Sequence, residues 1–249
     1  MCKFFSYTSD GAGNFNYFDW ELRKQCLEGE LSYNPDSHTS INDYFGFKGE
    51  LEDKRNKYEY NPITGIFKVD MLNTTDDSEA AEKWARALDF KTIVPQLNIK
   101  SIVHPFKIKA GDLNLAIERL HNWASVWGSV GVSVGGSVGV SVGGSVCGSV
   151  DGSVGGSVGV SVDGSVWGSV GGSVDGSVDG SVDDFVWAYA GSFFTLDKWQ
   201  YIDHKEGEYP FQSCVDLWES GYVSSFDGST WRLYSGENAD IVYEWEKEN

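Results

Sequence analysis

One repetitive stretch dominates the chain. It covers residues 125–182 and reads SVWGSVGVSVGGSVGVSVGGSVCGSVDGSVGGSVGVSVDGSVWGSVGGSVDGSVDGSV, with the dipeptide Ser-Val recurring every four residues. A strict internal repeat outranks local propensity in predicting a fold, because each unit tends to adopt the same structure. This stretch, which we call the array, therefore has the largest weight in predicting the fold.

A continuous α-helix is the less favoured structure for the array. Four residues advance a helix by about 400°, so the valine stripe would drift by about 40° per repeat and would bury no single face. Glycine also opposes a helix, because each one costs about 1 kcal/mol in a helix interior.

A period of two favours β-structure instead. Valine and the fourth position of each unit then lie on one face of a strand, and serine and the third position lie on the other. The aspartates inside the array all occupy the third position: Asp151, Asp163, Asp175 and Asp179. Short periodic units that share a core are typical of β-solenoids, so we expect a β-solenoid. A flexible Gly/Ser-rich linker is the alternative.

The array divides the sequence into three expected parts. Residues 1–123 are expected to form a globular α+β domain, and residues 124–184 the repetitive β segment. The aromatic-rich residues 185–249 are expected to form a small α+β cap, because the ends of a solenoid expose its core and its strand edges.

Local signals outside the array predict individual elements. Capping residues and apolar periodicity predict helices that follow Asp19 and Asp112, and further helices at residues 79–88 and 214–220. Alternating apolar residues predict strands at residues 2–8 and 15–18, and hairpins at residues 58–70 and 231–245.

Composition excludes two kinds of partner. The chain has 249 residues and a net charge of −18, and the array contains no Lys or Arg. A broad phosphate-binding surface needs clustered basic residues, so we expect no direct binding to nucleic acid. The sequence contains no apolar run long enough to span a membrane, and no Gly-rich phosphate loop with its lysine, so neither membrane insertion nor a nucleotide cofactor is expected.

Cysteine and histidine show no ligand spacing. The cysteines are Cys2, Cys26, Cys147 and Cys214. The histidines are His38, His104, His121 and His204. None of them forms a Cys-x-x-Cys motif or a helical His pair, so no metal site is expected. The absence of a signal-peptide pattern favours a reduced, cytoplasmic location.

Several segments carry a resemblance. They are MCKFFSYTSDGAGN, YFDWELR, PDSHTSINDYFGFKGE, the array, and YPFQSCVDLWESGYVSSFDGSTWRLYSG. Over nearly all of its length the chain resembles a group of proteins from phage and bacterial metagenomic sequences. The resemblance implies a phage or mobile-element context, and thus the host-cell cytoplasm, and it supplies no catalytic residue.

The Met-Cys start resembles that of amidotransferases and related N-terminal-nucleophile hydrolases. In such enzymes the removal of methionine exposes a terminal cysteine, whose α-amino group can serve as the base for the thiol. Those enzymes usually continue with Gly-Ile, whereas this chain continues with Lys-Phe. The resemblance therefore implies one candidate catalytic residue, Cys2. Polar residues that could surround it are Asp19, Arg23 and His38.

The favoured function is that of a non-enzymatic repeat scaffold for protein interaction or assembly, whose partner is another protein or a second copy of the chain. One alternative is an N-terminal-nucleophile hydrolase that uses Cys2. The other is an acidic mimic of nucleic acid that inhibits a basic host protein. The irregular spacing of the array's aspartates makes it a poor copy of regularly spaced phosphates.

Overall fold

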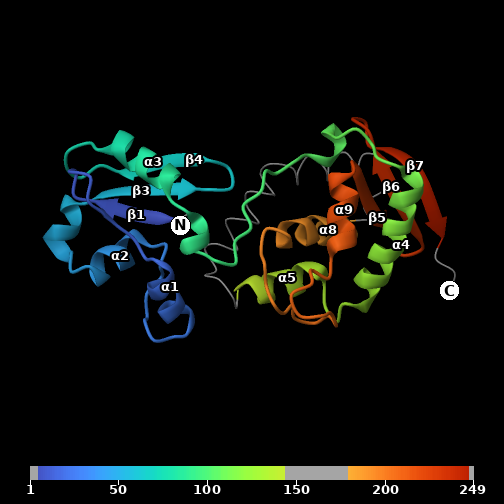
Figure 1. Cartoon of the computed structure of the whole chain (residues 1–249), viewed down its shortest axis with the longest axis horizontal. Helices are drawn as coiled ribbons and strands as arrows, with labels where there is room; N and C mark the ends of the chain where they lie inside the picture. The colour runs from blue at the N-terminus through green and yellow to red at the C-terminus, as the bar shows by residue number, and fades with distance from the viewer. Residues whose placement is uncertain (1–4, 144–178, 247–249) are drawn as a thin grey trace. The chain divides into compact units, whose positions relative to one another are not determined.

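The computed structural model describes residues 5–143 and 179–246 (Figure 1). These residues belong to two compact units, the first formed by residues 5–100 and the second by residues 101–142 and 179–246. The three-part division expected from the sequence stays a prediction, since most of its middle part lies outside the described residues. Within the described part of the chain, no helix is both long and apolar enough to cross a membrane.

The first unit is built on a four-stranded antiparallel sheet with the order β2-β1-β3-β4. Its strands are β1 (Ser6–Ser9), β2 (Phe15–Asn16), β3 (Asn56–Asn61) and β4 (Ile66–Met71). Its helices are α1 (Trp20–Leu27), α2 (His38–Tyr44) and α3 (Ser78–Ala87), with short 3-10 helices at Gly49–Lys54 and Phe90–Thr92. The predicted hairpin at residues 58–70 is confirmed as β3 and β4.

Helices cover both faces of this sheet, α3 on one side and α2 on the other (Figure 1). On the α3 side, the Trp84 ring stacks on Phe15 at 4.6 Å and packs against Tyr7 at 4.9 Å. On the α2 side, Ile41 is fully buried. The carboxylate residue Glu59 is also only 5% exposed. The sheet therefore has an aromatic face and a second face that buries charge.

The second unit contains a three-stranded antiparallel sheet with the order β5-β6-β7. Its strands are β5 (Tyr222–Phe226), β6 (Thr230–Ser235) and β7 (Asp240–Glu246). Its helices are α4 (Leu113–Ser129), α5 (Val134–Gly143), α8 (Asp179–Gly191) and α9 (Gln212–Glu219), with a 3-10 helix at Pro105–Lys107. The predicted cap of α4 is confirmed, because the Asp112 carboxylate accepts a hydrogen bond from the Leu115 backbone.

The β-solenoid predicted for residues 124–184 is wrong. Where the array is described, it contributes the last turn of α4, the whole of α5 and the first residues of α8. The two small antiparallel sheets of the described residues lie outside the array, and neither forms a solenoid. The role of residues 185–249 as a solenoid cap is therefore also wrong. Residues 144–178 of the array lie outside the described residues.

The length of α5 explains why a four-residue repeat can be helical. A drift of about 40° per repeat spreads the valines of the Ser-Val pairs around a helix only after many repeats. Because α5 contains few repeats, Val134 and Val138 both remain buried. Serine supports the same helix, since the Ser133 hydroxyl accepts from the Gly136 backbone and Ser141 donates to the Ser137 carbonyl at 2.6 Å.

Close packing offsets the glycine penalty in α5. A side chain at Gly135 would place its Cβ 3.0 Å from Trp187 in α8, closer than ordinary van der Waals contact. Glycine thus allows the two helices to approach at this point. Helix propensity, which describes a helix by itself, does not include this packing.

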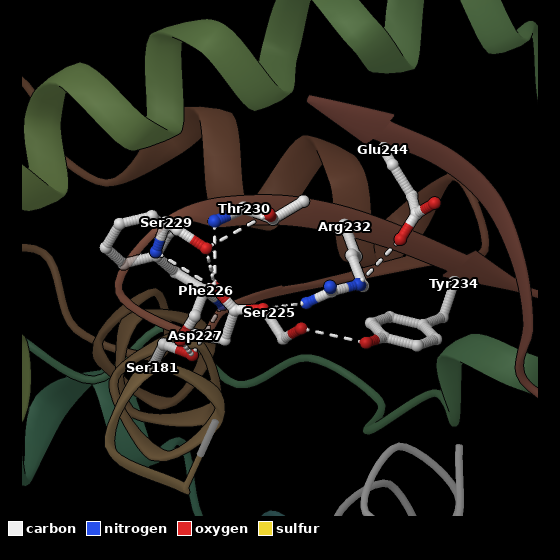
Figure 2. Close-up of polar contacts among 9 residues, drawn as sticks. All are labelled: Ser181, Ser225, Phe226, Asp227, Ser229, Thr230, Arg232, Tyr234 and Glu244. Carbon is white, nitrogen blue, oxygen red and sulfur yellow. Dashed lines mark hydrogen bonds and ion pairs between the residues drawn. The ribbon is translucent and has the colours of Figure 1, made fainter. Parts of the chain in front are cut away.

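The last serine of the array anchors α8 to the sheet, as Figure 2 shows. The Ser181 hydroxyl donates to the Phe226 carbonyl at 3.1 Å and accepts from the Phe226 backbone N–H at 2.8 Å. In the turn that follows, Asp227 accepts from the Thr230 backbone at 2.8 Å and from the Arg232 guanidinium. Arg232 also donates to Glu244 in β7 at 2.8 Å, so one guanidinium links the turn to two strands.

Asp227 should make the second unit sensitive to acid. The bond from Arg232, together with backbone N–H groups, holds the pKa of Asp227 well below its usual range. A lowered folded-state pKa gives stability that is complete above the ordinary value of about 3.9 and is lost as the pH falls towards the folded-state pKa. We expect Asp227→Asn to destabilise the unit in urea at pH 7, and the difference from wild type to shrink at about pH 2.5.

A matched change at Asp203, which is exposed, provides the control. Asp203→Asn should follow wild type at both pH values. A difference between Asp227→Asn and wild type that stays constant with pH would contradict the prediction.

Candidate metal centre

The candidate site begins with His38, the first residue of α2. Ser37 caps this helix, because its hydroxyl accepts from the Ser40 backbone. The His38 ring is buried, with Nε2 at 2.9 Å from the Tyr58 carbonyl oxygen in β3. A carbonyl oxygen can only accept, so Nε2 carries the proton. Nδ1 is then the nitrogen that faces Asp70, at 3.6 Å from Oδ2.

The β3–β4 hairpin supplies two carboxylates. Glu59 lies within β3, directly opposite Lys68 of β4. Further along, the pairing skips one residue, so that Asp70 is the extra residue of a β-bulge. Bulges re-aim side chains that regular alternation would place elsewhere. Here the bulged strand brings the Asp70 carboxylate to the His38 ring.

Lys68 lies against both carboxylates. Its Nζ donates to Asp70 Oδ1 at 2.9 Å and lies 3.5 Å from Glu59 Oε2. The hydrogen bond from Lys68 is the main cause that lowers the pKa of Asp70, against the opposing effect of partial burial, and the charges of Lys68 and Lys57 add to it. Asp70 is therefore ionised at neutral pH, as an anionic metal ligand must be.

The three side chains lie close to the separation that a metal ion requires. One ligand atom from each of His38, Glu59 and Asp70 can be chosen so that all lie within 4.8 Å of one another. Ligands of a tetrahedral zinc ion, with bonds of about 2.1 Å, lie about 3.4 Å apart. Small side-chain rotations would therefore complete the site. The N–H of His38 is also directed at a backbone carbonyl, which is how metal-binding histidines are commonly oriented.

A layer of buried polar groups adjoins these ligands. Ser6 of β1 pairs directly with Glu59 of β3, and Asn42 lies one turn after His38 in α2. Within the described residues, the hydroxyls of Ser6 and Thr8 and the amide of Asn42 are buried without a hydrogen-bond partner. Groups of this kind are normally bonded to water or an ion. The interior beside the ligands therefore suits a hydrated ion better than an apolar core would.

The polar residues that the sequence placed around Cys2 each contact different groups in the structure. Cys2 itself lies outside the described residues. Asp19 caps α1 by accepting from the Leu22 backbone at 3.1 Å. Arg23 is buried in an ion pair with Asp36. His38 is the one that reaches the candidate site, where it is a candidate metal ligand.

The sequence pattern predicted no metal site and did not single out Glu59 or Asp70. The three ligands come from one helix and two strands, so no short motif connects them. One signal was available, because a hairpin places alternate residues of both strands on one face. The bulge at Asp70 is a feature of the strand pairing that the sequence pattern did not indicate.

Comparison with known proteins supplies no function for the site. No family model matches the chain, and no curated protein or solved structure shows significant similarity to it. The functional conclusion is therefore drawn from the residues themselves.

Proposed function

We propose that this protein binds a divalent cation in its first unit, through His38, Glu59 and Asp70. The observation that carries the proposal is the convergence of an imidazole nitrogen and two carboxylates, from three different elements, to within 4.8 Å. Two of these ligands are almost fully buried, and Asp70 is 35% exposed, so the ion would enter from the Asp70 side. A bound ion would tie α2 to both strands of the hairpin.

The ligand chemistry selects among metals. One nitrogen and two carboxylate oxygens suit Zn²⁺ or Mn²⁺, and the divalent affinity series places Zn²⁺ above Mn²⁺. Ca²⁺ takes six to eight oxygen ligands and fits this set poorly. We therefore expect the affinity to fall in the order Zn²⁺, Mn²⁺, Ca²⁺.

Thermal unfolding of the full chain, with and without each ion, tests the proposal. A ligand that binds only the folded state stabilises it by about 2.7 kcal/mol at a concentration of one hundred times its Kd. Wild type should be stabilised most by Zn²⁺. Glu59→Gln keeps the shape of the side chain but removes the anionic ligand. It should weaken Zn²⁺ binding more than about a hundredfold, because even the loss of an outer-shell partner typically costs 10–100-fold.

The matched control is Glu79→Gln, which removes one carboxylate from the exposed surface of α3. It should bind Zn²⁺ as wild type does. If Glu59→Gln and wild type gained the same stability from Zn²⁺, the ion would be bound elsewhere, for example by cysteine thiols, and the proposal would fail.

The wider role proposed here is the one expected from the sequence, a non-enzymatic scaffold for protein interaction or assembly, in the cytoplasm of a phage-infected cell as the resemblance implies. Apolar side chains at the exposed edge of the first sheet support a protein partner or self-association: Ile66, Val69, Met71 and Leu72. The net charge of −18 supports the absence of direct nucleic-acid binding. Partner capture at low and high salt separates this role from nucleic-acid mimicry, which depends on charge and would be lost at high salt.

A further inference from the structure

We propose that Lys68 is a built-in counter-cation that competes with the divalent ion for Glu59 and Asp70 and so sets the affinity of the site. This inference rests on the proposed function. It adds that the resting site already holds a positive charge of its own, which an entering ion must displace.

The position of Lys68 carries the argument. Its ammonium lies 2.9 Å from an Asp70 oxygen and 3.5 Å from a Glu59 oxygen. With a neutral imidazole at His38, these groups sum to one net negative charge. A divalent ion bound by the same two carboxylates would lie within a few ångströms of the ammonium, and the two cations would repel each other.

The exposure of Lys68 allows its ammonium to leave the site when a divalent ion binds. Its side chain is 57% exposed, whereas that of Glu59 is 6% exposed. A lysine stem is flexible and its ammonium is strongly hydrated, so the ammonium can move into water while the strands stay in place. Binding of the metal then requires the loss of two ion pairs, and that loss lowers the affinity.

Three full-length variants, titrated with Zn²⁺ by calorimetry, test the proposal. Lys68→Met keeps most of the stem and removes the charge, so it should tighten binding about tenfold. Lys68→Arg places a planar, five-donor fork beside both carboxylates, which it can hold more firmly, so it should bind Zn²⁺ more weakly than wild type. Lys83→Met removes an exposed charge from α3 in the same unit and should change the affinity less than about twofold.

The outcomes distinguish this inference from the proposed function. Wild-type binding that Glu59→Gln abolishes and Lys68→Met leaves unchanged would overturn the role of Lys68 and keep the metal site. Weaker binding by Lys68→Met would show that Lys68 orients Asp70 instead, and would also overturn the inference. If neither wild type nor Lys68→Met bound Zn²⁺ while both were folded by circular dichroism, the metal site and the counter-cation would both fail.

Discussion

Breaking the buried ion pair between Arg23 and Asp36 should remove about 3–5 kcal/mol from the stability of the first unit. The guanidinium donates to both carboxylate oxygens, at 3.1 and 2.5 Å, and the two side chains are 3% and 0% exposed. Arg23→Met leaves a carboxylate buried without its counter-charge, and Asp36→Leu does the same to the guanidinium. Hydrogen exchange of the β1 and β3 amides reports the loss for this unit alone.

The double variant shows whether the loss of stability comes from leaving one charge buried without its partner. Arg23→Met/Asp36→Leu should recover most of the loss, because an apolar pair of similar volume is often as stable as a buried ion pair. Glu82→Gln, which breaks the exposed ion pair with Arg86, provides the control and should cost less than about 0.5 kcal/mol. Single variants no less stable than this control would contradict the prediction.

The ion pair also bears on the candidate metal centre. Asp36 directly precedes Ser37, which caps α2, and His38, which begins it. Arg23 belongs to α1 and also donates to the Phe18 carbonyl at 2.9 Å. The pair therefore fixes the point at which α2 starts and, with it, the place of the His38 ring. Neither residue of the pair belongs to the candidate ligand set.

The sequence predicted helices and strands well where residues adjacent in the chain determine the structure. Asp19 and Asp112 cap helices as expected, because a capping carboxylate needs only the next turn of the chain. The β3–β4 hairpin follows from alternation and a short turn, in which Gly65 has a φ of 68°. The helix predicted at residues 79–88 is confirmed as α3, which begins one residue earlier, at Ser78, and ends at Ala87.

The array shows where such signals stop. A period of four residues cannot keep the valines of the Ser-Val pairs on one face of a long helix, but it can do so in a short one. The chain uses short helices: in α5, Val134 and Val138 are buried while Val140 is exposed, and Gly135 leaves room for Trp187. Tertiary packing therefore decides the conformation of α5, and the repeat pattern contains no information on where Trp187 lies.

The convergence of the three residues at the candidate metal centre could not be predicted for a similar reason. His38 was a polar candidate, but the sequence does not indicate that the first residue of α2 contacts β3 and β4. Glu59 reads as an ordinary strand residue opposite Lys68, where an exposed ion pair would be expected. Its burial depends on α2 lying over this face of the sheet, which no local pattern shows.

Replacing Trp218 by alanine should destabilise the second unit by about 3–5 kcal/mol. The Trp218 side chain is fully buried and lies flat on Tyr189, with ring centroids 4.2 Å apart and an interplanar angle of 4°. It also stacks with Phe185 at 5.9 Å, so it joins α9 to two aromatic residues of α8. Its Nε1 donates to the Val103 carbonyl at 2.7 Å. Alanine leaves a large cavity and removes this bond.

Two further variants show which feature of Trp218 accounts for the lost stability. Their stability is measured by urea unfolding, followed by tryptophan fluorescence. Trp218→Phe keeps an aromatic ring but no donor for Val103, so it should cost about 1–3 kcal/mol, between wild type and alanine. Tyr201→Ala truncates an aromatic side chain of the same unit that is 53% exposed, and it should stay within about 0.5 kcal/mol of wild type. The order expected from burial is therefore Tyr201→Ala, Trp218→Phe, Trp218→Ala, from the mildest to the most severe. A Trp218→Ala protein as stable as Tyr201→Ala would show that the ring of Trp218 does not hold α8 and α9 together.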